Sequence, residues 1–156
     1  MVQDTNNTFE LIERLNDFST LEGVVGLFGE KGDSKVEGAD LTIAQLAAVH
    51  EFGADGHIPT RPWVSVGFER AMPDMEEVIA KGVDQVIAGS TSAGEVLDRA
   101  TLIAETEIKE YGVSGVPPPN APSTIARKGS SVTLVDTGRM VGSVTHGYRP
   151  RTNSDG

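Results

Sequence analysis

Apolar residues recur at every third or fourth position in three segments of the chain, which is the spacing of an amphipathic helix. Residues 8–18 predict a first helix. Residues 41–52 predict a second helix, with Asp40 as its N-cap and Gly53 as the residue that ends it. Residues 93–111 predict a long helix whose broad apolar stripe packs against a sheet or a partner subunit.

Polar residues and prolines indicate where helices begin and end. Ser92 and Glu95 have the spacing of a capping box, which starts the long helix. Residues 53–63 contain two glycines and two prolines, so this segment is predicted to be irregular. Thr60 is placed to cap the helix that follows, and Pro73 either interrupts or kinks that helix or starts a new turn.

β-Branched and glycine-rich runs predict the strands. Residues 21–32 predict a strand that runs into a turn, and residues 34–37 predict a second, short strand. Near the C-terminus, residues 132–135 and 141–148 predict two more strands on either side of a turn. Three or four strands with four helices indicate an α+β fold, in which a small, mostly antiparallel sheet packs against several helices.

Residues 113–131 form a long connection that contains four prolines. A connection of this length is usually functional or irregular. The stiffness of the Val-Pro-Pro-Pro run favours an arm that orders against a neighbouring subunit over a flexible insertion. The length of 156 residues suits a single domain, 1–156, with this extended arm and a flexible tail at 149–156.

The net charge of −10 is unevenly distributed. Residues 1–126 carry 21 acidic and 8 basic side chains, whereas residues 127–156 carry 2 acidic and 5 basic ones. An acidic body repels nucleic acid and favours solubility. The basic end either binds an acidic surface, such as the body of a neighbouring copy, or is a solvated tail.

Two classes of protein are disfavoured by composition. The chain has no cysteine, which excludes disulfides, thiolate metal sites and a cysteine nucleophile. No apolar run approaches the roughly 20 residues that cross a bilayer, and the N-terminus lacks the features of a signal peptide. We therefore expect a soluble protein with no membrane partner.

The triplet Asp136-Thr137-Gly138 has the sequence of an aspartic protease's catalytic strand. The chain contains one such triplet, Arg139 follows where those enzymes have a small residue, and 20 residues remain after Asp136. That length does not accommodate the rest of a protease half-barrel. We therefore interpret the triplet as a turn, in which Asp136 or Thr137 caps a short helical segment and Gly138 relaxes the backbone.

Histidines suggest a metal site but do not have the expected spacing. His50 and His57 lie seven residues apart, whereas helical metal motifs place ligands three or four residues apart. A histidine that is satisfied at a helix C-terminus is the commoner role. His146 falls in the last predicted strand, and no nucleophile elbow or phosphate loop is present. We expect no catalytic residue, no metal ligand and no cofactor.

Three stretches in this order resemble one protein family. They are residues 47–63 (AAVHEFGADGHIPTRPW), 118–131 (PPNAPSTIARKGSS) and 134–148 (LVDTGRMVGSVTHGY). Together they resemble the tail-completion, or neck, proteins of tailed bacteriophages, which are also called virion morphogenesis proteins. The likeness spans roughly residues 40–148, with Trp63 where the family usually has phenylalanine.

The resemblance implies a structural virion protein of the phage neck, which joins the head to the tail within a hexameric ring around the DNA channel. It implies no catalytic activity. The implied partners are other copies of the chain, head-closure or connector proteins, and tail terminator or tail tube proteins, while genomic DNA passes without sequence-specific binding. Such a protein assembles in the cytoplasm of the host bacterium and resides in the virion.

Other functions stay open at this point. A tail terminator of similar fold is the first alternative, and a metal-dependent or aspartic-type hydrolase is the second. A small toxin-like or regulatory binding module is a third.

The candidate interface residues lie at the helix start after the irregular segment, in the arm and in the basic end. They are Arg61, Pro62, Trp63, Pro117, Pro118, Arg127, Lys128 and Arg139. Trp63 has core packing as its alternative role. If the arm joins subunits, deletion of residues 114–128 should abolish the ring and leave a folded monomer.

Overall fold

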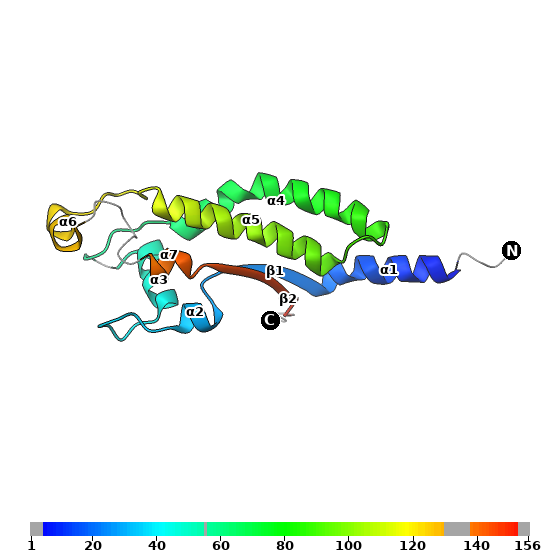
Figure 1. Cartoon of the computed structure of the whole chain (residues 1–156), viewed down its shortest axis with the longest axis horizontal. Helices are drawn as coiled ribbons and strands as arrows, with labels where there is room; N and C mark the ends of the chain where they lie inside the picture. The colour runs from blue at the N-terminus through cyan, green and yellow to red at the C-terminus, as the bar shows by residue number, and fades with distance from the viewer. Residues whose placement is uncertain (1–4, 55, 130–137, 153–156) are drawn as a thin grey trace.

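Two long helices, α4 (Trp63–Ile87) and α5 (Ala93–Val113), run side by side as a hairpin and form the centre of the molecule (Figure 1). The computed structural model describes residues 5–54, 56–129 and 138–152. A two-stranded antiparallel sheet packs against α5. The predicted α+β class, with a small antiparallel sheet against several helices, is confirmed.

The sheet joins the two ends of the described chain. Strand β1 (Leu21–Gly26) pairs with β2 (Thr145–Pro150), so that Leu21 lies opposite Pro150 and Val25 opposite His146. Helix α1 (Thr5–Thr20) runs directly into β1, which confirms the predicted first helix and extends it at both ends.

The described residues contain fewer strands than predicted. The strand expected at 21–32 ends at Gly26, because the short helix α2 (Gly29–Asp33) follows it. No strand forms at 34–37, where Lys35 makes only an isolated bridge to Thr42. Seven helices and one two-stranded sheet therefore replace the expected four helices and three or four strands in the described part of the chain.

Helix α3 (Ile43–Phe52) begins two residues later than predicted. Thr42, not Asp40, is its N-cap: the Thr42 hydroxyl accepts a hydrogen bond from the Gln45 backbone N–H, and the Gln45 side chain accepts one from that of Thr42. The Asp40 carboxylate instead pairs with Lys35 at 2.6 Å. Gly53 ends the helix as predicted, at a positive φ of 78° that glycine tolerates.

The C-terminal region also differs from prediction. Helix α7 (Arg139–Gly142) occupies the start of the strand expected at 141–148, so β2 begins only at Thr145. The strand continues through Arg149 and Pro150, which places these two residues in the sheet and not in a tail.

The turn before α7 is described only from Gly138 onwards. Gly138 is the N-cap of α7 and has a φ of +70°, which confirms its predicted role in relaxing the backbone. The expected caps Asp136 and Thr137, and the strand expected at 132–135, lie outside the described residues.

The ends of α5 follow local sequence signals. Ser92 and Glu95 form the predicted capping box, and the helix ends at Val113, one residue after Gly112. Helix α4 runs through Pro73 as a single helix of 25 residues, so the predicted interruption is absent. None of the described helices combines the length and apolar content that crossing a membrane requires.

The contact between α4 and α5 depends on glycine. A Cβ atom at Gly67 would lie 2.6 Å from the Cα of Ile108, and one at Gly82 would lie 2.4 Å from Cγ1 of Val96. Neither distance is compatible with normal packing, and the first obstacle is backbone, which does not move aside easily. The two helices therefore approach closely because these positions of α4 have no side chain.

The main core lies at the end of the hairpin where α3, α7 and the first turn of α4 meet α5. Trp63 is completely buried there, so its core role is the one the structure supports. The other buried members of this cluster are Ile43, Ala47, Ile108, Val116, Met140, Val141 and Val144.

We predict that Gly67→Ala destabilises the fold, although alanine is the better helix former. Overpacking typically costs about 1–3 kcal/mol, and here it acts against the backbone of Ile108. Urea denaturation measures the change. Gly142→Ala, in helix α7 with nothing within 4 Å of its added Cβ, is the control and should be neutral or slightly stabilising. Equal stability of the two variants would contradict the close helix contact.

Candidate functional site

A buried carboxylate fixes the start of α4. Glu51, in the last turn of α3, is 8% exposed, and its two oxygens accept hydrogen bonds from the backbone N–H groups of Val64 (2.8 Å) and Ser65 (3.1 Å). The Ser65 hydroxyl also donates to Glu51, at 2.5 Å. These N–H groups belong to the first turn of α4, where a helix has unsatisfied donors and a partial positive charge.

The predicted cap is therefore wrong. Thr60 makes no cap for α4, because its hydroxyl donates to the backbone carbonyl of Phe52 at 3.2 Å. Pro62 occupies the N-cap position and has no side-chain cap of its own. Glu51, a residue of the preceding helix, caps α4 instead.

Arg61 connects this helix junction to the arm. Its side chain is buried, and its Nε donates to the carbonyl of Pro118 at 2.9 Å. One terminal nitrogen lies 3.5 Å from both the Pro119 carbonyl and the Asn120 side-chain oxygen. Its backbone N–H donates to the carbonyl of His50 at 2.7 Å. Burial lowers the pKa of Arg61 from its usual value.

The arm is anchored at its base and extends beyond the body at its tip. Val116 is buried in the core, whereas Pro117 and Pro118 are exposed. Residues 122–128 form helix α6 (Pro122–Lys128), which ends at Gly129 with a φ of +69°. Figure 1 shows α6 at the far end of the molecule from α1. The expected extended arm thus carries a short helix.

A cleft at the base of the arm brings together the described parts of three separate sequence stretches. Ile58 and Arg61 line it from the irregular segment before α4. Pro118 and Asn120 line it from the arm, and Arg139 from the start of α7. These stretches are those whose sequence resembles the neck proteins, so segments far apart in sequence meet at one place.

The candidate interface residues have different environments. Arg61 and Trp63 are buried, so neither side chain is exposed to a second subunit in this conformation. Pro62 is partly exposed, and Pro117, Pro118 and Arg139 are exposed. Arg127 and Lys128 lie in the last turn of α6, and the structure does not describe their side chains.

The histidines do not form a metal site within the described residues. His50 and His57 both line the cleft. No group of three or more His, Asp or Glu side chains in residues 5–54, 56–129 and 138–152 is arranged to hold a metal ion.

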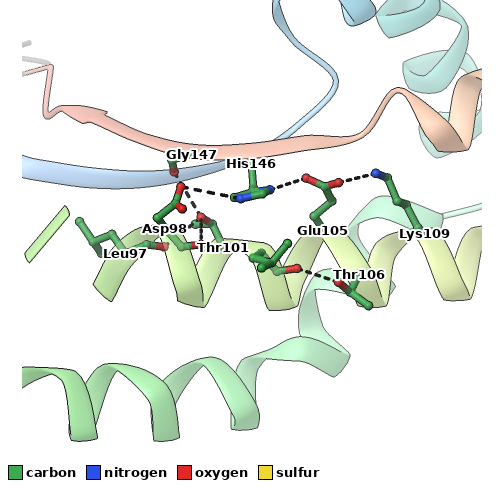
Figure 2. A network of polar contacts seen from close by, with 9 residues as sticks. Leu97, Asp98, Thr101, Glu105, Thr106, Lys109, His146 and Gly147 are labelled. Carbon is green, nitrogen blue, oxygen red and sulfur yellow. Dashed lines mark hydrogen bonds and ion pairs between the residues drawn. The ribbon is translucent and has the colours of Figure 1, made fainter. Parts of the chain in front are cut away.

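His146 belongs to a polar network between β2 and α5 (Figure 2). Its Nδ1 lies 2.5 Å from the Glu105 carboxylate, its Nε2 lies 3.7 Å from Asp98, and Lys109 pairs with Glu105. Because both ring nitrogens face carboxylates, the ring bridges strand to helix. The nearby hydroxyl of Thr101 lies 2.9 Å from the carbonyl of Leu97 in its own helix and 3.3 Å from that of Gly147, so it can donate its one hydrogen to either and lies in contact with β2.

The charge of Glu105 is stabilised by this network. Burial raises the pKa of Glu105. The hydrogen bonds and charges of Lys109 and His146 lower it by a larger amount, so the pKa lies below the ordinary value of a glutamate. A carboxyl group with a lowered pKa in the folded state stabilises the fold above its unfolded-state pKa. That contribution is lost as the pH falls through the folded-state pKa.

Sequence reasoning missed the roles of the Glu51 and Glu105 carboxylates. Glu51 lies 13 positions before Val64, and no local spacing rule connects the two. Asp98, Glu105 and Lys109 lie along one side of α5 at intervals of seven and four residues, which is a detectable pattern. That pattern indicates that a polar partner lies beside the helix, and it does not identify His146.

Comparisons of the chain with protein-family models, with curated protein sequences and with solved structures find no match. The likeness to phage neck proteins therefore depends on the three sequence stretches themselves.

We predict that Glu51→Ala lowers the free energy of unfolding by about 0.5–2 kcal/mol, because it removes the acceptor of two N–H groups in the first turn of α4. Glu51→Gln should lose less, since it retains one side-chain oxygen as an acceptor. Chemical denaturation of the variants measures both effects. Glu69→Ala, at an exposed position of α4, is the control and should stay within about 0.5 kcal/mol of the unmodified chain. A Glu51→Ala variant as stable as this control would refute the cap.

We predict that Glu105→Gln destabilises the protein in a pH-dependent manner. The difference in unfolding free energy from the unmodified chain should be large at about pH 5.5 and should shrink towards about pH 3, as Glu105 becomes protonated in the folded state. Denaturant titrations across this range test it. Glu110→Gln, exposed on the same helix, is the control. A difference that grows as the pH falls would have the wrong sign.

Proposed function

We propose that this chain is a structural subunit of the neck of a tailed bacteriophage, where it joins head to tail as part of a ring around the DNA channel. The observation that carries the proposal is the meeting of the three resembling stretches. Their described parts line one cleft, and the buried guanidinium of Arg61 binds the arm there through the carbonyl of Pro118. We expect segments that resemble the same protein family and also lie at one place in the fold to contribute to the same function.

The shape of the chain supports an assembly role. The arm projects from one end of the α4–α5 hairpin, and α1 projects from the other (Figure 1). A subunit with projections at opposite ends can contact one neighbour at each end. Such head-to-tail contacts close into a ring when the rotation between subunits permits it.

The charge distribution supports the passage of DNA. The acidic side chains of residues 1–126 outnumber the basic ones by 13. A ring of such bodies repels the phosphate backbone, so DNA can move through it without being retained. In this proposal the ring is hexameric. Head-closure or connector proteins bind one side, and tail terminator or tail tube proteins bind the other.

Genetic disruption tests the function itself. A stop codon in this coding sequence of the phage genome should yield filled heads and complete tails that remain separate in electron micrographs. Tails of abnormal length would instead indicate a tail terminator. Normal virions would contradict the proposal.

We predict that the arm tip is needed for assembly and not for folding. Deletion of residues 114–128 is unsuitable as a test, because it removes the buried Val116 and the carbonyl that Arg61 binds. Replacement of residues 121–128 by eight glycine and serine residues preserves both. This variant should be a folded monomer by light scattering and circular dichroism.

The control replaces the exposed residues 88–90 by glycine and serine, which alters the turn between α4 and α5 at the other end of the hairpin from α6 (Figure 1). It should assemble as the unmodified chain does. Full-size rings formed by the arm-tip variant would contradict the role of the arm.

A further inference from the structure

Arg61 is a buried cation that pairs with no carboxylate in the described part of the chain. The residue is 5% exposed, and its guanidinium binds uncharged oxygens, those of Pro118, Pro119 and Asn120. Burial lowers the pKa of Arg61, as expected for a charge that has been removed from water. Buried charges in proteins are usually paired with an opposite charge. A negative charge beside this guanidinium would therefore be stabilised.

One end of the guanidinium has hydrogen-bond donors that the arm does not use. An arginine side chain carries five N–H groups. Nε and Nη2 of Arg61 make the contacts with the arm, at 2.9 Å and 3.5 Å. Nη1 makes no hydrogen bond to a described residue, and it is not among the described polar atoms that are fully enclosed without a partner. Because Arg61 lines the cleft at the base of the arm, we place the two N–H groups of Nη1 on the cleft wall.

The walls of this cleft are mostly apolar. Its volume is about 860 Å³. The apolar side chains that line it include Val36, Ile43, Leu46, Ile58, Pro59 and Met140. Concave, mostly apolar surfaces with a few convergent polar groups are typical of ligand sites. A ligand that fits the cleft therefore has an apolar body and a group that accepts hydrogen bonds from Nη1.

The charges of the described lining residues favour a ligand with a single negative charge. Arg61 and Arg139 are the arginines of the lining, and Glu37 is its carboxylate. With His50 and His57 neutral, these residues give a net charge of +1. A carboxylate carries one charge and matches the planar guanidinium. A phosphate group carries about two negative charges at pH 7, which Glu37 repels more strongly, and it has no apolar part to bury.

We propose that the cleft at the base of the arm binds a carboxylate of a partner protein, carried by an acidic side chain within an apolar segment, and that Nη1 of Arg61 holds this carboxylate. The bound carboxylate neutralises the buried guanidinium, and the apolar residues on either side of it cover the cleft walls. Nε of the same guanidinium binds Pro118, so the partner segment and the base of the arm are held by one side chain. The inference concerns contacts of a single chain, so it goes beyond the proposed function and does not depend on it.

Binding of two blocked tripeptides to the isotope-labelled full chain tests the site by NMR. Acetyl-Leu-Asp-Leu-amide carries a carboxylate between apolar side chains, and acetyl-Leu-Asn-Leu-amide is the neutral control of the same shape. The first should shift the Arg61 Nε–H signal until the site is saturated. The second should bind at least about tenfold more weakly, because it lacks the charge that strengthens the hydrogen bonds. Equal affinities of the two tripeptides would overturn the proposal, as would inorganic phosphate that binds as tightly as the first.

A pair of arginine variants tests the role of Arg61 itself. Arg61→Gln removes the charge and keeps an N–H donor for the arm, so it should bind the two tripeptides equally. Arg70→Gln is the matched control, because Arg70 has an exposed side chain on α4 and does not line the cleft. This control should keep the preference for the charged tripeptide. A preference that persists in Arg61→Gln, or that is lost in Arg70→Gln, would overturn the proposal. If Arg61→Gln fails to fold, the comparison of the two tripeptides on the unmodified chain decides.

The outcomes separate this inference from the proposed function. Equal binding of the two tripeptides would overturn the carboxylate site and leave the neck assignment standing. Normal virions after disruption of the coding sequence would overturn the neck assignment and leave the carboxylate site standing.

Discussion

The buried carboxylate of Glu51 determines how the two halves of this small fold are oriented. It binds the first N–H groups of α4 from the last turn of α3, and the donors lie 13 and 14 residues further along the chain. Because this contact fixes the start of α4, it also fixes Trp63, the first residue of that helix, in the centre of the core. Loss of the carboxylate would leave the first N–H groups of α4 without their acceptor.

Two further contacts depend on this junction. Arg61 precedes α4 by two residues, and its guanidinium reaches the base of the arm only because α3 and α4 hold the intervening loop in place. Helix α4 in turn packs closely on α5 through its glycines, and α5 supports the sheet through Thr101 and the Glu105–His146 pair. These contacts join the parts of the body, and the arm tip and the N-terminal part of α1 extend beyond its opposite ends (Figure 1). That division of roles suits a subunit whose purpose is to contact its neighbours.

The sequence predicted the features whose cause is local. The Ser92–Glu95 capping box and the positive φ values at Gly53 and Gly138 follow from residues close to one another, and the structure has them. The α3 cap shows the limit of such rules, because Asp40 and Thr42 both fit a cap and only Gln45, three residues after Thr42, distinguishes them. Thr42 is the cap because it and Gln45 exchange reciprocal hydrogen bonds, and the cap preference of a single residue does not include these bonds.

The features that sequence reasoning missed have long-range causes. Glu51 replaces Thr60 as the cap because the two helices meet in space. The apolar residues at 141 and 144 were assigned to a strand, yet they are buried in the core from α7 and the turn that follows it. The spacing of residues along the chain also does not show which candidate interface residues are buried. Trp63 lies inside the core, whereas Pro118 lies on the surface.

Electron microscopy of the purified chain tests the proposed ring most directly. A neck-ring subunit should form closed rings with a central channel wide enough for duplex DNA, and its class averages should have one rotational axis through that channel. Monomers at all concentrations, open filaments, or dimers with a two-fold axis and no channel would contradict it.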